Sequence, residues 1–181
     1  MSNRQADALV VFGITGDLAR KMTFRSLYRL EQHGLLEVPV IGVAVDDMSE
    51  EQLRDRARES IEQSGERIDE ETFGRFAGRL RYVRGDFGDE QTYASVAGAL
   101  HGLDDPVFYL EIPPSLFGRV VEGLAGAGLV SHGQRVVVEK PFGHDLDSAR
   151  SLAADLHRYL DESQLYRIDH FLGKMGLEEI L

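Results

Sequence analysis

The sequence contains no cysteine. A chain without cysteine can form no disulfide, offers no thiolate nucleophile and cannot ligate a metal through sulfur. Redox chemistry in such a protein depends on a bound cofactor, and we identify no metal site in the sequence. The lack of cysteine also fits a reducing compartment.

Long hydrophobic runs are missing as well. No segment approaches the roughly 20 consecutive apolar residues that a membrane-spanning helix requires. Residues 1–7 are polar and lack the basic and hydrophobic regions of a secretory signal. We therefore expect a cytoplasmic protein without a membrane partner.

Basic residues are too few to balance the acidic ones. The chain has 20 lysines and arginines against 31 aspartates and glutamates, a formal net charge of −11. Nucleic acids and anionic membranes both favour basic surfaces, so we expect neither as a partner. Any anionic ligand must be held locally, by backbone amides or by a few well-placed cations.

The chain does contain a regular series of short apolar runs, within 181 residues that are 43% hydrophobic. Runs rich in valine, isoleucine and leucine are typical of strands that are covered on both faces. They predict strands at residues 8–12, 39–45, 80–83, 107–112, 135–139 and 165–169.

Between these runs, apolar residues lie three or four positions apart, which indicates amphipathic helices. The predicted helices span residues 18–32, 49–63, 69–79, 90–99, 114–127 and 146–160. Ser49 is expected to cap one helix, and Gly34 and Gly128 to end two others. Because strands and helices alternate, we predict an α/β fold with a doubly wound parallel sheet, a Rossmann-like dinucleotide-binding domain over residues 1–181.

A glycine-rich turn follows the first predicted strand and opens a helix. Its residues are Gly13, Ile14, Thr15, Gly16, Asp17 and Leu18. In dinucleotide-binding folds, small residues at this place permit a tight turn and let backbone amides approach a pyrophosphate, which the helix N-terminus attracts. We predict that the turn binds the cofactor. The alternative is a plain strand-to-helix turn with Asp17 as the helix cap.

Two acidic residues, Asp46 and Asp47, follow the second predicted strand. A carboxylate here can accept hydrogen bonds from a ribose 2′-hydroxyl but repels a 2′-phosphate. Asp46 therefore favours NAD over NADP as the cofactor. The alternative is a solvated turn before the helix cap at Ser49.

Polar residues also follow the fifth and sixth predicted strands. Lys140 comes after the fifth strand, and Asp169, His170 and Lys174 come after the sixth. Because these strand ends share one edge of a parallel sheet, we expect the side chains to converge on a phosphorylated substrate. Asp169 suits the orientation of a histidine base. The alternative is that the lysines are surface cations, that His170 caps a helix and that Asp169 ends a strand.

Four segments carry a resemblance to a known family. They are FGITGDLARK at residues 12–21, FYLEIPP at 108–114, VEKPFG at 138–143 and YRIDHFLGK at 166–174. Through them the chain resembles the N-terminal domain of the glucose-6-phosphate dehydrogenase family over essentially its whole length. The resemblance implies oxidation of glucose 6-phosphate at C1 to 6-phosphogluconolactone, with hydride transfer to NAD or NADP, at the start of the pentose phosphate pathway.

The resemblance also implies roles for residues near the cofactor. The turn at residues 13–18 would bind it, Asp86 after the third strand would lie close to it, and Lys140 would contact both cofactor and sugar. Val45 stands where NADP-using members of the family carry an arginine, which again favours NAD.

On the substrate side, the resemblance implies that His170 and Lys174 hold glucose 6-phosphate. Asp169 would orient the histidine that accepts the proton of the C1 hydroxyl. That histidine belongs to the family's second domain, beyond residue 181, so the chain would be inactive alone.

Several positions depart from the family pattern. Met22 stands in place of a lysine and Arg25 in place of a proline, so one substrate-side cation is missing. Phe171 replaces a tyrosine, and Met175 replaces a glutamate.

The end of the sequence looks unfinished. Residues 173–181 have the pattern of a helix without a cap or a terminating glycine or proline. We expect a fragment in which residues 170–181 begin a second domain, and a full-length protein that is a homo-oligomer.

Three other functions are consistent with parts of the pattern. A sugar dehydrogenase of the glucose-fructose oxidoreductase kind would share the Glu-Lys-Pro after the fifth strand but not the run at residues 167–174. A short-chain reductase would need a Tyr-x-x-x-Lys pair, which the sequence lacks. A non-catalytic dinucleotide-binding module would bind nucleotide without turnover.

Overall fold

The computed structural model describes residues 5–131, 133–140, 142 and 145–168. These residues form one sheet of six parallel strands in the order β3-β2-β1-β4-β5-β6. The strands are β1 (Ala8–Phe12), β2 (Val40–Ala44), β3 (Leu80–Arg84), β4 (Pro106–Leu110), β5 (Arg135–Glu139) and β6 (Leu165–Ile168). The predicted doubly wound parallel sheet is confirmed. Because β3 and β4 are consecutive in sequence but not neighbours, the topological switch point lies between β1 and β4.

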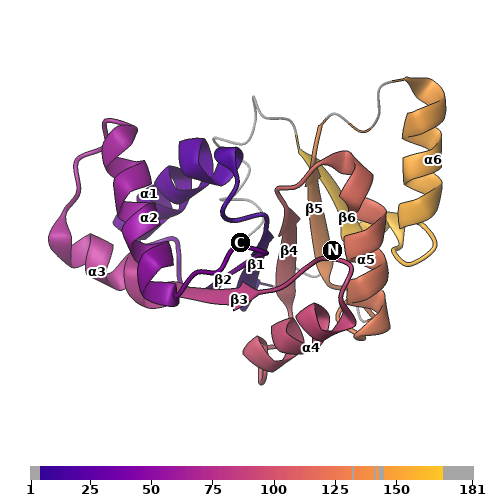
Figure 1. The fold of residues 1–181 in the computed structure, drawn as a ribbon, viewed down its shortest axis with the longest axis horizontal. Helices are drawn as coiled ribbons and strands as arrows, with labels where there is room; N and C mark the ends of the chain where they lie inside the picture. The colour runs from indigo at the N-terminus through magenta and orange to yellow at the C-terminus, as the bar shows by residue number, and fades with distance from the viewer. Residues whose placement is uncertain (1–4, 132, 141, 143–144, 169–181) are drawn as a thin grey trace.

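Helices cover both faces of this sheet (Figure 1). Cluster residues from α1 (Phe24–Gln32), α2 (Glu50–Gln63) and α3 (Glu70–Arg79) pack on one face. Residues from α4 (Glu90–Ala99), α5 (Phe117–Gly126) and α6 (Leu146–Leu156) pack on the other. Three short helical segments complete the fold: the π-helical η1 (Ala19–Thr23) and the 3-10 helices η2 (Pro114–Leu116) and η3 (Glu162–Gln164).

Strand β1 shows why the apolar runs predict buried strands. All of its residues are buried, and they alternate between the two clusters, with Leu9 and Val11 in one and Val10 and Phe12 in the other. A strand covered on both faces needs apolar side chains at every position. The edge strand β3 is only partly buried and carries arginines, as edge strands commonly do.

The helix starts and ends follow the expected signals, with two differences. Ser49 caps α2 through a reciprocal pair of hydrogen bonds with Gln52. The first helix is not a regular α-helix throughout, because its residues Ala19–Thr23 form the π-helical η1. There the Phe24 N–H donates to the Ala19 carbonyl, while the Arg20 carbonyl accepts from the Ser60 hydroxyl of α2. Helix α6 ends at Leu156 rather than at residue 160.

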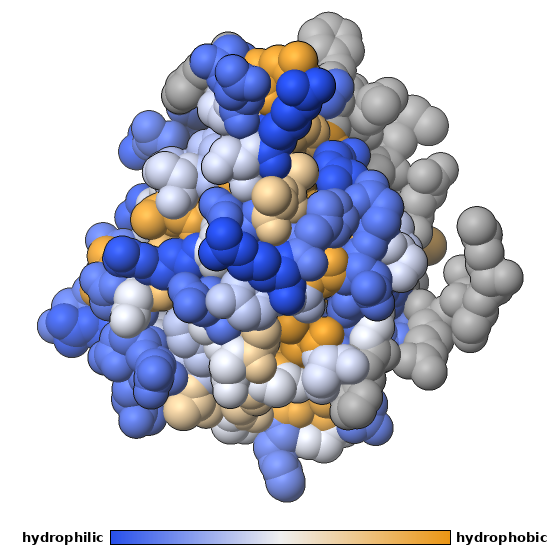
Figure 2. Space-filling view, turned by 90° about the vertical axis from the view of Figure 1, so that its right-hand side faces the viewer, coloured by the Kyte–Doolittle hydropathy of each residue, from blue (hydrophilic) through white to orange (hydrophobic). Residues whose placement is uncertain are grey.

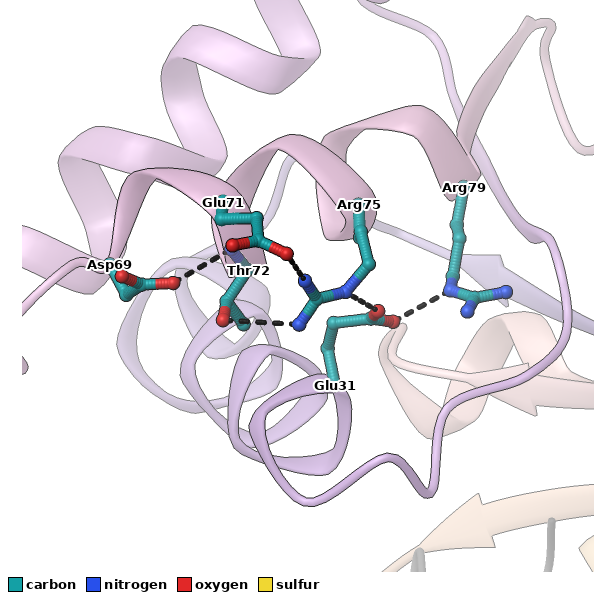
Figure 3. Close-up of polar contacts among 6 residues, drawn as sticks. All are labelled: Glu31, Asp69, Glu71, Thr72, Arg75 and Arg79. Carbon is teal, nitrogen blue, oxygen red and sulfur yellow. Dashed lines mark hydrogen bonds and ion pairs between the residues drawn. The ribbon is translucent and has the colours of Figure 1, made fainter.

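A buried carboxylate joins α1 to α3 (Figure 3). The Glu31 side chain is 4% exposed and accepts hydrogen bonds from Arg75 Nε at 3.2 Å and Arg79 Nε at 2.6 Å. Arg75 also donates to Glu71 and Thr72 of its own helix. A buried charge is tolerated only when it is paired in this way, so these arginines fix the packing of the two helices.

The side of the molecule that carries α6 faces the viewer in Figure 2. Its surface is mostly hydrophilic, with apolar patches that are small and separated. Within the described parts of the chain, no helix is both long enough and apolar enough to cross a membrane.

We expect Arg79→Ala to destabilise the fold by about 1–3 kcal/mol, because it leaves the buried Glu31 carboxylate with one arginine instead of two. Arg150→Ala is the control, since Arg150 is 71% exposed and its ion pair with Asp147 spans 4.0 Å. Its effect should stay within about 0.5 kcal/mol. Urea unfolding measures both variants. Equal effects would show that the Glu31 pairs contribute no more than a surface contact.

Candidate functional site

The predicted cofactor residues follow the carboxyl ends of four parallel strands and therefore lie at one edge of the sheet. The glycine turn, residues 13–18, follows β1, Asp46 follows β2, Asp86 follows β3 and Lys140 follows β5. In open parallel sheets this carboxyl edge holds the ligand crevice, at the topological switch point. The predicted substrate residues Asp169, His170 and Lys174 lie outside the described residues.

Gly13 is enclosed by its neighbours and adopts a backbone conformation that suits glycine, with φ at +88°. A Cβ at this position would lie 2.3 Å from the Glu111 carbonyl oxygen and 2.9 Å from Ile112 Cγ2. The Gly13 N–H donates to the Val43 carbonyl at 2.8 Å. The turn is thus held between β2 and β4, where no larger residue fits.

The rest of the turn presents backbone rather than side chains. The Ile14 side chain is fully buried and packs against Gly42 of β2. A Cβ built on Gly42 would lie 2.6 Å from Ile14, so the absence of a side chain at Gly42 makes room for it. Gly16 and Asp17 are exposed. The Asp17 cap considered as an alternative is not found, because Asp17 is already helical and the Arg20 N–H donates to the Gly16 carbonyl at 3.2 Å, so the cap position belongs to Gly16, which has no side chain. The first amides of this helix can therefore receive an anion.

Two polar contacts tie the glycine turn to the segment after β2. The Thr15 hydroxyl donates to Asp46 Oδ2 at 2.6 Å, and Arg56 of α2 donates to the Thr15 carbonyl at 2.6 Å. The Tyr82 hydroxyl donates to the Asp46 carbonyl at 2.8 Å, and burial raises the pKa of Tyr82 to about 12. Asp46 is thus held beside the turn with its carboxylate exposed to solvent.

The other predicted contact residues are also at this edge. Asp86 is exposed, and its carboxylate accepts from the Gly88 N–H at 2.7 Å, which shapes the loop between β3 and α4. Lys140 is exposed, and its backbone N–H donates to the Ile168 carbonyl at 3.2 Å, which continues the pairing of β5 with β6. The cofactor and substrate roles of both residues remain predictions.

Sequence reasoning missed a buried acidic group at the end of β4. Glu111 is 9% exposed, and its carboxyl accepts a hydrogen bond from the Thr23 hydroxyl of η1. Burial raises the pKa of Glu111 to about 8, the Thr23 bond lowers it, and the nearby Glu139 raises it again. Tyr109 donates to Glu139 from the neighbouring strand. The available signal was one acidic residue inside the apolar run 107–112.

A separate groove of about 1160 Å³ runs between α4 and α5. Its lining includes Tyr93, Ala97, Arg119 and Gly126, and the glycine turn does not contribute to it. The groove lies on the helical layer and reaches the loop between β3 and α4 through Phe87 and Gly88, but it does not include the glycine turn.

Comparison with known proteins gives a consistent result. A family model described as glucose-6-phosphate dehydrogenase, NAD binding domain, matches residues 10–178. A glucose-6-phosphate 1-dehydrogenase of Mycobacterium tuberculosis is 55% identical over 175 residues, covering 97% of the chain and 37% of that protein. The one of Bacillus subtilis is 35% identical over 192 residues, covering 99% and 38%. The chain thus spans somewhat over a third of the length of these relatives.

Solved structures agree with these matches. The crystal structure of glucose-6-phosphate 1-dehydrogenase from Mycobacterium avium superposes with a TM-score of 0.91 at 56% identity, covering 97% of this chain and 38% of that one. A glucose-6-phosphate dehydrogenase in complex with its substrate glucose-6-phosphate gives a TM-score of 0.85 at 33% identity, covering 94% and 38%.

We expect Gly13→Ala to destabilise the chain more than Gly34→Ala. Both glycines have positive φ, but nothing lies within 4 Å of a Cβ built on Gly34. The left-handed conformation alone costs about 1–2 kcal/mol, and the contact with Glu111 adds about 1–3 kcal/mol at Gly13. Chemical denaturation of both variants measures the difference. Matching losses would mean that the turn can move away from β4.

The stability of the chain should depend on pH through Glu111. Its pKa is higher in the folded state than the ordinary value of 4.5. Its stabilising contribution is therefore complete below pH 4.5 and is lost as the pH rises from there toward about 8. Relative to Glu111→Gln, the natural chain should lose at most about 1.4 kcal/mol per pH unit over this window. Parallel urea titrations from pH 5 to 9 test this, and a difference that stays constant with pH would contradict it.

Proposed function

The chain belongs to the glucose-6-phosphate dehydrogenase family, whose NAD-binding domain it matches over residues 10–178, and from that membership we propose that the protein oxidises glucose 6-phosphate to 6-phosphogluconolactone. The hydride passes to a nicotinamide dinucleotide. The observation that carries the proposal is the enclosed Gly13 at the switch point, followed by helix amides that no side chain caps. Neither a glucose-fructose oxidoreductase nor a non-catalytic module is favoured by the comparisons.

The glycine turn fits a dinucleotide pyrophosphate. Gly13 lacks the side chain that would collide with β4, and the exposed Gly16 leaves the backbone open to a ligand. The backbone amides of residues 13–18 would hold the two phosphates, assisted by the dipole of the helix that starts there. When bound, the nicotinamide ring supplies the acceptor for the hydride.

Asp46 supports a preference for NAD. Its exposed carboxylate can accept hydrogen bonds from an adenosine ribose, whereas a 2′-phosphate would meet a like charge. Two arginines also lie close to this segment, where Arg84 pairs with Asp47 at 3.0 Å and Arg56 donates to the Thr15 carbonyl. Each guanidinium keeps further N–H donors, so the proposed preference for NAD rests on the Asp46 carboxylate. Asp86 is proposed to lie near the same cofactor.

The substrate side of the proposal rests on residues that follow β5 and β6. We propose that Lys140 contacts cofactor and sugar, that His170 and Lys174 hold the phosphate, and that Asp169 orients a histidine base. The base itself is proposed to lie in a second domain that begins at residues 170–181. The relatives' greater length supports this division, because the chain covers 37% of the Mycobacterium tuberculosis protein. A cytoplasmic location and homo-oligomeric assembly stay predictions from the sequence.

Cofactor choice is tested by calorimetric titration of the chain with NAD and NADP. We expect NAD to bind more tightly. Asp46→Asn should weaken the binding of NAD about tenfold or more, because one charged hydrogen bond is lost. It should also reduce the difference in affinity between NAD and NADP. Asp47→Asn is the matched control and should change NAD affinity little. Tighter binding of NADP by the natural chain would reverse the assignment, and binding of neither nucleotide would refute the cofactor site.

Turnover tests the activity itself. The complete reading frame that contains this chain should reduce NAD or NADP when glucose 6-phosphate is added, as followed by the absorbance of the reduced nicotinamide. The 181-residue chain by itself should bind nucleotide without turnover. Glucose 6-phosphate oxidation by the short chain would place the base within it, and inactivity of the complete protein would favour a binding module.

A further inference from the structure

Four side chains form an acidic cluster beneath the carboxyl edge of the sheet: the buried Thr23 of η1, Tyr109 of β4 and Glu111 after β4, and the half-buried Glu139 of β5. Thr23 donates to Glu111 Oε1, and Tyr109 donates to Glu139 Oε1. The other Glu111 oxygen, Oε2, is buried without a hydrogen-bond partner in the described part of the chain. An ionised carboxylate with one oxygen left bare is costly inside a protein.

Ionising both carboxyl groups of this cluster is energetically unfavourable. Tyr109 has a single hydroxyl proton, and its pKa is raised by burial first and then by the two neighbouring carboxyl groups of Glu111 and Glu139. The Tyr109 hydroxyl also interacts with Glu111 and lowers its pKa, but its one proton cannot serve both carboxyl groups at once. Two carboxylates that share a site do not both ionise readily.

Within the part of the chain that the structure describes, no positive charge acts on the Glu111 carboxyl. Three elements face its carboxyl, and they contribute the uncharged Thr23 and Tyr109 and the acidic Glu139. Among the described residues, Glu139 is the one ionic group that acts on it, and its charge opposes ionisation. Burial and the neighbouring Glu139 thus raise the pKa of Glu111 to about 8, which favours the neutral carboxyl near neutral pH.

Glu111 is also built into the place where the proposed cofactor phosphates bind. Its backbone N–H donates to the Phe12 carbonyl at 2.9 Å, and its carbonyl oxygen closes over Gly13. Its carboxyl holds Thr23, which is in the same helix that starts from the glycine turn. Protein rather than water would therefore separate a charge on this residue from the pyrophosphate. Protein screens charge repulsion less than water does.

We propose that Glu111 is a proton-binding residue coupled to the dinucleotide site, so that the pyrophosphate binds tightly only while Glu111 carries its proton. The inference rests on the proposed dinucleotide site and adds a linkage to it. A nearby anion favours the neutral carboxylic acid, so binding takes up a proton whenever free Glu111 is ionised. Affinity is therefore constant where free Glu111 is protonated and falls as pH rises beyond that range.

The test is calorimetric titration of the chain with NAD between pH 6 and 10, in paired buffers of different ionisation enthalpy. For the natural chain, affinity should fall on the order of tenfold across the alkaline range, with net proton uptake near pH 8. Glu111→Gln resembles the protonated side chain and should bind with the natural chain's neutral-pH affinity at every pH. Glu122→Gln, an exposed carboxyl on α5, is the matched control and should keep the natural profile.

A second variant keeps the test decisive if Glu111→Gln fails to fold. Thr23→Val removes the hydroxyl that favours ionised Glu111, so the fall in affinity should shift to higher pH. Identical pH profiles for the natural chain and Glu111→Gln, or an unshifted profile for Thr23→Val, would overturn the coupling and leave the cofactor site intact. Failure of every variant and of the natural chain to bind NAD at any pH would instead refute the proposed function.

Discussion

The close approach of Gly13 to the Glu111 carbonyl is the contact on which the rest of the site depends. It occurs where the two halves of the doubly wound sheet meet, between β1 and β4. Because no side chain fits there, the chain leaving β1 can turn sharply at Gly13 and enter the first helix. The same contact buries the start of the segment after β4, and with it the Glu111 side chain.

The neighbouring elements support this turn rather than act independently. Gly42 of β2 leaves the space that the Ile14 side chain fills, so the turn is anchored in the core on one side. Thr15 and Arg56 fix its other side against Asp46 and α2. The proposed pyrophosphate and ribose sites are therefore held in a fixed relation by protein contacts that need no ligand. Such preorganisation lowers the ordering cost of binding.

Much of the fold could be predicted from the sequence because it depends on local patterns. Apolar runs predicted all six strands, and capping residues such as Ser49 predicted helix starts. The π-helical η1 could not be predicted, since it depends on a hydroxyl that Ser60 supplies from another helix. The Glu111 cluster and the Thr15–Asp46 bond likewise depend on side chains that meet only after folding. The glycine motif marked the site, but not the buried carboxyl beneath it.

The central claim is that a dinucleotide binds at the carboxyl ends of β1 and β4, beside the glycine turn. Amide NMR spectra of the ¹⁵N-labelled chain, recorded during titration with NAD, test it most directly. The account predicts that the largest shift changes fall on residues 13–18, 45–47 and 111–112, around the glycine turn and the ends of β2 and β4. Changes confined to the groove between α4 and α5, or none at saturating NAD, would contradict it.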